Sequence, residues 1–176
     1  MNLNDPNMSD EDDDFSEDED TQKDKFLTFH LADEDYAIEI RYVTEIIGIQ
    51  KITQVPDLPQ FLKGVINLRG NVIPVMDVRT RFHIEEREYT ERTCIIVVDL
   101  NKTSVGLVVD MVSEVVDILE DKIEPPPKIQ MMGKNSYILG LGKIGDRVKI
   151  ILDVNKLLFK EEVDQLAGVL PPEEEE

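Results

Sequence analysis

The stretch KGVINLRGNVIPVMD, residues 63–77, decides the fold predicted for this chain. Its apolar residues form two short runs, 65–68 and 72–76, which are typical of β-strands. The link between them is Arg-Gly-Asn, and Gly followed by Asn permits the positive φ angles that a tight hairpin turn requires. We therefore predict a hairpin with Arg69 near its tip. Pro74 lacks a ladder donor, so we expect the second strand to lie at a sheet edge or to be kinked.

Similar short apolar runs, separated by polar turns, occupy most of the remaining chain. The further predicted strands are residues 26–31, 36–40, 93–100, 104–110, 112–119, 137–144 and 147–152. Apolar positions within residues 41–47 have a spacing that favours one or two helical turns ending at Gly48. Residues 153–169 open with a capping aspartate and predict a helix. Many short strands with a turn about every ten residues favour two small packed barrels.

The formal net charge of −19 is concentrated at the two ends of the chain. The first 25 residues hold 11 acidic and 2 basic residues, and the last four are all Glu. We therefore expect residues 1–24 to be an acidic disordered extension, residues 25–168 to form the domain, and residues 169–176 to be an acidic tail. The 23 acidic and 17 basic residues between 26 and 170 show no basic cluster, which argues against binding to nucleic acid.

The cellular compartment is predicted from the single cysteine and the absence of long apolar runs. Cys94 alone can form no internal disulfide and no cysteine-based metal site, which is typical of a reducing compartment. No apolar stretch approaches the ~20 residues that span a bilayer, and no secretory signal pattern opens the chain. We expect a cytoplasmic protein.

Residues 140–145, GLGKIG, match the Gly-x-Gly-x-x-Gly fingerprint of dinucleotide sites. That fingerprint needs a following helix, whereas the next residues alternate as a strand does, so no cofactor is expected. His30 and His83 are isolated, which predicts no metal site, and no nucleophile elbow is present. We predict that the protein is not an enzyme.

Four aspartates follow or end apolar runs, where a turn or cap role is expected, with contact to a partner as the alternative: Asp77, Asp99, Asp110 and Asp153. Arg69 is either a solvated turn residue or a planar donor, held out by the rigid hairpin, that binds a carboxylate or carbonyl of a protein partner.

Residues 63–77 closely resemble the CheW family of bacterial chemotaxis coupling proteins. Supporting segments follow in family order: YVTEII (42–47), VP (55–56), VGLVVD (105–110), VSEV (112–115), GLG (140–142) and ILD (151–153). The resemblance covers about residues 25–168. It implies two intertwined five-stranded SH3-like β-barrels with a C-terminal helix. It also implies a non-enzymatic adaptor, recruited to receptor arrays at the inner membrane, that joins chemoreceptor cytoplasmic tips to the regulatory domain of the histidine kinase CheA.

The resemblance also implies two sets of binding residues. Those expected to contact the receptor, whose apolar helical ridge would enter a groove, are Val43, Glu45, Gly64 and Arg69. Those expected in an exposed apolar patch for the kinase are Ile40, Val43, Val105 and Gly106. The two acidic ends of the chain lie outside the family pattern.

Three alternatives remain open. The chain could be the adaptor half of a CheV-like protein, although no βα-repeating segment is present for a receiver domain. A barrel enzyme that uses Asp77 or Asp110 is a second alternative. An oligonucleotide-binding barrel is the third, and the charge and the scarce aromatic residues oppose it.

Overall fold

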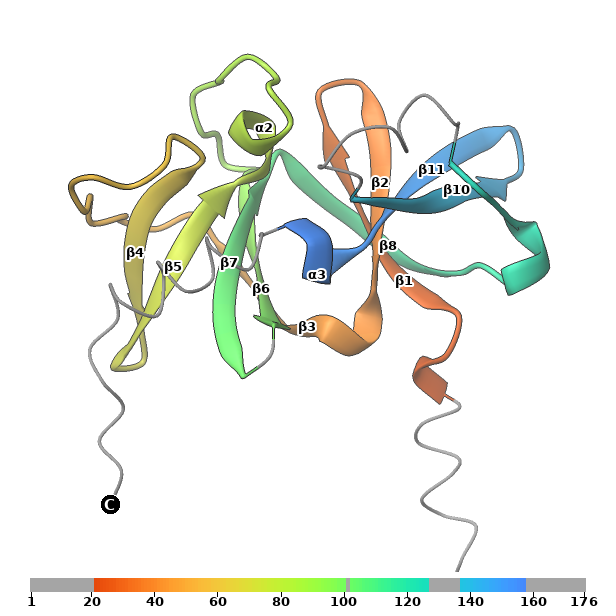
Figure 1. Ribbon diagram of the computed structural model, residues 1–176, viewed down its shortest axis with the longest axis horizontal. Helices are drawn as coiled ribbons and strands as arrows, with labels where there is room; N and C mark the ends of the chain where they lie inside the picture. Colours follow the sequence, from red (N-terminus) through yellow and green to blue (C-terminus); the bar gives the residue numbers. More distant parts are fainter. Residues whose placement is uncertain (1–20, 101, 127–136, 158–176) are drawn as a thin grey trace, which may run out of the picture.

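The computed structural model describes residues 21–100, 102–126 and 137–157, which form two β-sheets that pack side by side (Figure 1). The first sheet has the order β8 (Met111–Asp117), β1 (Lys25–Leu31), β2 (Glu34–Glu39), β11 (Arg147–Leu152), β10 (Ile138–Ile144) and β9 (Ile123–Glu124). The second has the order β3 (Val43–Gly48), β6 (Cys94–Leu100), β7 (Thr103–Val109), β5 (Asn71–Asp77) and β4 (Leu62–Leu68). Short helices are α2 (Val78–Arg81), α3 (Val154–Leu157) and two 3-10 turns, Ile40–Tyr42 and Glu120–Lys122.

The two sheets are intertwined through the order of the chain. Strands β1 and β2 begin the first sheet, β3 to β7 build the second, and β8 to β11 return to complete the first. Strand β1 pairs antiparallel with both β2 and β8, and β2 pairs in parallel with β11. Pairing of the first and last parts of the chain therefore holds the second sheet as an insertion within the first.

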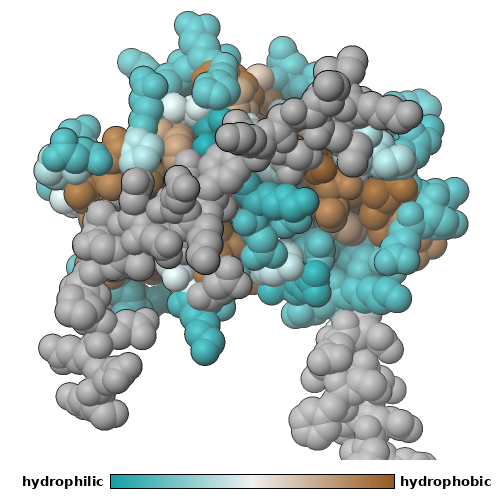
Figure 2. Space-filling view, in the orientation of Figure 1, coloured by the Kyte–Doolittle hydropathy of each residue, from teal (hydrophilic) through white to brown (hydrophobic). Residues whose placement is uncertain are grey.

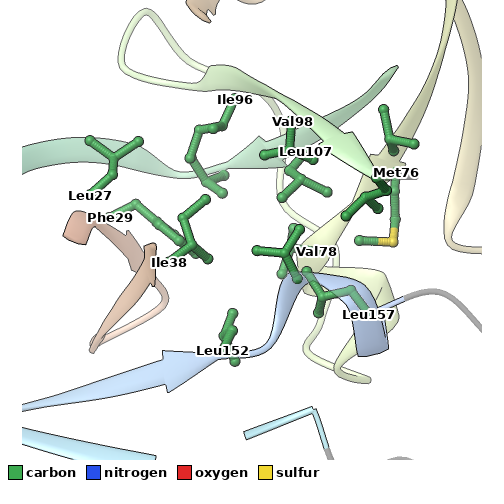
Figure 3. Close-up of a cluster of buried hydrophobic side chains, with 14 of the residues drawn as sticks. Leu27, Phe29, Ile38, Met76, Val78, Ile96, Val98, Leu107, Leu152 and Leu157 are labelled. Carbon is green, nitrogen blue, oxygen red and sulfur yellow. The ribbon is translucent and has the colours of Figure 1, made fainter. Parts of the chain in front are cut away.

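One apolar core lies between the sheets and belongs to both (Figure 3). Leu27 and Phe29 enter it from β1, and Val98 and Leu107 enter it from β6 and β7. All four side chains are at most 2% exposed. Burying one such side chain contributes about 1.5–3 kcal/mol, so this shared core fixes how the two sheets sit against each other.

The predicted mainly β architecture in two halves is confirmed, and so are the hairpins β1–β2, β4–β5, β6–β7 and β10–β11. The barrels are open along their strand ladders in the described residues, and the first sheet has six strands because the short β9 joins β10. The edge strands of the second sheet are β3 and β4. A single bridge, Thr53↔Val65, links β4 to the segment that follows β3.

The predicted helical turns over residues 41–47 are wrong. Ile40–Tyr42 forms one 3-10 turn, and Val43–Gly48 is a strand that pairs antiparallel with β6. β-Branched side chains fill most of that strand and favour extended backbone, and a partner strand was available to accept its hydrogen bonds. In so short a segment, the spacing of apolar residues fits both the helical period of about 3.6 residues and the strand period of two residues.

Pro74 does not place β5 at an edge, because β5 lies between β4 and β7. Its parallel pairing with β7 covers only Val75, Met76 and Asp77. Pairing of β5 with β7 therefore begins one residue after Pro74. The N–H that proline lacks is not needed for the hydrogen bonds of that ladder. The glycines of residues 140–145 lie in β10 and in its turn with β11, as predicted, and no helix follows them.

The ends of the predicted domain are only partly within the described residues. Regular strand structure begins at Lys25, where the domain was predicted to begin. Helix α3 occupies Val154–Leu157, and the rest of the helix predicted over 153–169 lies outside the described residues. The acidic extension up to residue 20 and the acidic tail lie outside them too, so the predicted domain boundaries stay predictions.

Candidate protein-binding site

The tip of the β4–β5 hairpin carries the first predicted site residue, Arg69. Arg69 has φ 52° and Gly70 has φ 88°, so these two residues supply the positive angles of the turn, in place of Gly70 and Asn71 as predicted. The side chain of Arg69 is 72% exposed. Positive φ is uncommon for a residue with a long side chain, and most of the surface of this one lies in solvent.

The structure pairs Arg69 with Glu45, which the resemblance had placed in the same set. A terminal nitrogen of the Arg69 guanidinium donates to both carboxylate oxygens of Glu45. Glu45 lies on β3, at the opposite edge of the second sheet from β4, so this pair and the Thr53↔Val65 bridge join the two edges. An exposed ion pair contributes only ~0–1 kcal/mol to stability, so its worth to the fold is small.

Gly64, the third predicted receptor residue, is buried by the chain itself. It has φ 141°, and a Cβ added there would lie 2.0 Å from the carbonyl oxygen of Thr53. The neighbouring Val65 donates its N–H to that same oxygen at 2.9 Å, and Thr53 N–H donates to Val65 O at 2.8 Å. Gly64 therefore acts on the shape of this edge, where it lets residue 53 approach β4.

We expect Gly64→Ala to lower the free energy of unfolding by about 2 kcal/mol, because alanine is strained at this φ and its Cβ would displace Thr53. Urea unfolding followed by circular dichroism measures the loss. The matched control is Gly48→Ala, where an added Cβ meets nothing within 4 Å, and which should change stability by no more than about 0.5 kcal/mol. Equal effects of the two variants would contradict the packing role of Gly64.

The predicted kinase-binding residues do not form one exposed patch. Val43, Val98 and Val105 lie side by side across β3, β6 and β7. Val105 is 1% exposed, and Gly106 is buried so tightly that an added Cβ would lie 2.8 Å from Cγ2 of Ile95.

The expectation of exposure is therefore wrong for Val105 and Gly106, because neighbouring strands and the core cover both faces of β7 there. Ile40 and Val43 are half-buried and pack against the edge of the shared core. They keep part of their surface in solvent, as a contact residue must.

Two exposed apolar residues near the site were missed. Ile46 on β3 is 43% exposed and Val72 on β5 is 41% exposed. The alternation of β3 would have revealed Ile46 had the segment been assigned to a strand, since exposed and half-buried positions alternate along it. In Figure 2, hydrophobic residues reach the surface on the β4 side of the second sheet and around β10 and β11 of the first. Polar residues surround both places.

A second cluster of polar groups joins the two sheets at the other end of the hairpin strands. The guanidinium of Arg79 donates to both oxygens of Asp110 at 2.7 Å, and its third nitrogen donates to Glu85 O at 2.7 Å. Asp110 also accepts the N–H of Ala32 at 2.9 Å, and Ala32 lies between β1 and β2. Asp110 thus ties α2, beside the second sheet, to a turn of the first.

The charges of this cluster stabilise one another. Burial alone would raise the pKa of Asp110, but the hydrogen bonds from Arg79 and Ala32 outweigh it and lower that pKa below its usual value of 3.8. The same hydrogen bonds, which Arg79 donates to Asp110, raise the pKa of Arg79. Asp110 and Arg79 are therefore both charged over the whole physiological pH range.

Asp77 has the capping role predicted for it. Its Oδ1 accepts the N–H of Arg79 at 2.9 Å at the start of α2, and its Oδ2 accepts the hydroxyl of Tyr89 at 3.0 Å. Burial, followed by the charge of Asp77, raises the pKa of Tyr89. Asp77, Tyr89 and Asp110 line a cavity of about 370 Å³, but each oxygen of both carboxylates already accepts a hydrogen bond from the protein. The enzymatic alternative relied on these two aspartates, and their bonding is that of structural groups.

Asp153 also caps a helix: its Oδ1 accepts the N–H of Asn155 at the start of α3 at 3.0 Å. Asp99 is exposed within β6 and does not cap. Within the described residues no group of three or more His, Cys, Asp or Glu side chains could hold a metal ion. No helix in that part of the chain is long and apolar enough to cross a membrane.

Comparison with known proteins gives one consistent result. The family model for the CheW-like domain matches residues 25–162. Chemotaxis protein CheW of Klebsiella aerogenes is 40% identical over 139 residues, 79% of this chain and 84% of the relative. Chemotaxis protein CheW of Bacillus subtilis is 36% identical over 137 residues, 78% of this chain and 88% of the relative. The crystal structure of the scaffolding protein CheW from Thermoanaerobacter tengcongensis superposes with a TM-score of 0.72 at 37% identity, over 79% of this chain and 94% of that one.

Proposed function

Because this chain belongs to the CheW-like family, we propose that it is a non-enzymatic adaptor that couples chemoreceptor cytoplasmic tips to the histidine kinase CheA in chemotaxis signalling. It acts in the cytoplasm and is recruited to receptor arrays at the inner membrane. Coupling of this kind requires two faces that are occupied at once, so that the state of the receptor biases the state of the kinase.

The observation that carries the receptor face is the exposed Arg69 at the hairpin tip, paired with Glu45 across the sheet. The pair engages one terminal nitrogen of the guanidinium and leaves its other donors toward solvent, where a planar fork can bind a carboxylate or a backbone carbonyl. Val43 lies on the same strand as Glu45. In this proposal Arg69, Glu45 and Val43 contact the receptor helix, and the buried Gly64 sets the shape of the edge that receives it.

For the kinase face, Ile40 and Val43 are the proposed direct contacts because both are partly exposed, at the first residue of the 3-10 turn and the first residue of β3. Val105 and Gly106 lie beneath the surface and support β6 and β3 through the sheet. Their proposed role is to fix the position of Val43, since the register places Val43, Val98 and Val105 in one row. Val43 belongs to both proposed faces.

We propose residues 25–168 as the coupling domain, with acidic segments before and after it that adjust affinity for partners through charge. Such an effect would be weakened by salt, because exposed charges are screened over about 8 Å at physiological ionic strength.

The direct test mixes the purified protein with receptor cytoplasmic fragments and CheA. We expect a ternary complex in size-exclusion chromatography and a receptor-dependent change in CheA autophosphorylation. The control omits this protein from the same mixture, which should leave receptor and kinase uncoupled. Failure to bind either partner would rule the proposal out.

A further inference from the structure

The β4–β5 turn is built in a way that is costly for arginine. A two-residue hairpin turn of this kind needs positive φ at both central residues, and Gly, Asn or Asp occupy such positions most readily. Here the first is Arg69 at φ 52° and the second is Gly70 at φ 88°. A residue with a long side chain is disfavoured in this conformation unless its surroundings hold it there.

One side chain, that of Asn67, stabilises this turn conformation. Oδ1 of Asn67 accepts the backbone N–H of Gly70 at 2.9 Å. This N–H belongs to the peptide group that joins Arg69 to Gly70, so the bond fixes the orientation of that peptide and with it the ψ angle of Arg69. Asn67 is itself exposed and is the next-to-last residue of β4.

The conformation of Arg69 decides where its guanidinium goes. Glu45 lies on the far edge of the same sheet, and with the turn in this conformation its carboxylate accepts hydrogen bonds from the guanidinium. A different ψ at Arg69 would swing the side chain away from Glu45 and leave it free among many rotamers. Ordering such a side chain again on binding would cost affinity.

We propose that Asn67 is a positioning residue for Arg69: its side-chain carbonyl holds the turn in the conformation that presents the guanidinium beside Glu45. This inference rests on the proposed contact of Arg69 with the receptor and deepens it. Asn67 touches no partner in this scheme, and its effect on receptor binding passes entirely through Arg69.

The hairpin offers a matched control. Asn71 is also exposed, lies opposite Leu68 at the start of β5, and makes no side-chain hydrogen bond within the described part of the chain. Asn67→Ala and Asn71→Ala therefore remove the same amide from the same hairpin, and only the first removes the bond to Gly70. Asn67→Asp keeps an acceptor oxygen on a side chain of equal length.

The experiment titrates the full-length variants with a receptor cytoplasmic fragment. We expect Asn67→Ala to bind about fivefold more weakly, the effect of one lost hydrogen bond, with Asn71→Ala and Asn67→Asp within about twofold of the parent. CheA binding should be unchanged in all of them. Adding Asn67→Ala to Arg69→Ala should produce no further loss of receptor affinity, because the two residues act as one unit.

Three results would overturn the inference. They are Asn67→Ala binding as well as Asn71→Ala, Asn67→Asp binding as poorly as Asn67→Ala, and an equal loss from Asn67→Ala with or without Arg69. If Arg69→Ala alone keeps the parent affinity, the proposed receptor contact fails together with the inference. If Arg69→Ala binds the receptor weakly and Asn67→Ala binds it as well as the parent does, the inference fails and the proposed receptor contact stands.

Discussion

Replacing Asp110 with alanine is expected to lower the free energy of unfolding by about 3 kcal/mol, at the lower end of the loss seen when one partner of a buried ion pair is removed. The side chain of Arg79 is only 9% exposed, and Asp110 accepts two of its hydrogen bonds at 2.7 Å. Alanine would leave that guanidinium with Glu85 O as its remaining acceptor. The link through Ala32 to the first sheet would be lost as well.

Thermal unfolding is the measurement for this prediction. A loss of this size corresponds to a fall of roughly 6–12 °C in the midpoint for a domain of about 150 residues. The matched control is Asp99→Ala, an exposed strand aspartate whose side chain makes no bond within the described residues. If both variants melt at the same temperature, the pair with Arg79 is not what holds the sheets together at this point.

The pH dependence gives an independent check of the same bond. The pKa of Asp110 is lower in the folded protein than its usual value of 3.8. Its contribution to stability is therefore fully present above that value and is lost as the pH falls through the folded-state pKa. The difference in unfolding free energy between the parent and Asp110→Ala should be constant near neutral pH and should shrink below a pH of about 4. A difference that grows on acidification would contradict this assignment.

Replacing Arg69 with alanine is expected to weaken receptor binding about thirtyfold, a loss of about 2 kcal/mol that is typical of an arginine at the centre of an interface. Stability should change by less than about 1 kcal/mol, because the pair with Glu45 is exposed. Alanine also keeps a Cβ at the positive φ, so the strain of the turn is not relieved. Receptor-dependent control of CheA autophosphorylation and the thermal midpoint should be measured on the same sample.

Arg147 offers a closely matched control for this variant. Its side chain is 71% exposed, against 72% for Arg69, and it also contacts a carboxylate, that of Asp35 at 3.2 Å. It lies on β11 of the first sheet, away from the proposed receptor face. Arg147→Ala changes the net charge equally and should leave receptor binding within about twofold. A collapse of the midpoint in Arg69→Ala would instead make Arg69 a structural residue.

Local patterns in the sequence predicted the strands and hairpins well, because alternation and turn residues act over a few neighbouring positions. The β4–β5 hairpin and its tip at Arg69 follow from 15 residues of sequence, residues 63–77. A turn or cap role for Asp77 was likewise expected from its position after an apolar run, although the helix that it caps, α2, was not predicted. The family resemblance then grouped Arg69 with Glu45, which composition and spacing alone would not have done.

Contacts between distant segments decided the rest. Strand β3 was misassigned because its extended form depends on hydrogen bonds to β6, about 50 residues later in the chain. Val105 and Gly106 were predicted to be exposed, yet side chains from other strands bury both of them. Neighbouring residues in the sequence do not reveal such burial, because the covering side chains come from distant segments. Gly64 was assigned a contact with a partner, whereas the carbonyl of Thr53 fills the space beside it.

For this protein, the sequence by itself determined most of the strands, the hairpins and the family, since these follow from short-range preferences and from a motif of fixed spacing. Only the tertiary structure decided which side chains remain in solvent and which distant charges meet. The Arg69–Glu45 pair forms where the two edges of the second sheet approach each other, and the Arg79–Asp110 pair forms where α2 meets the strands that join the two sheets.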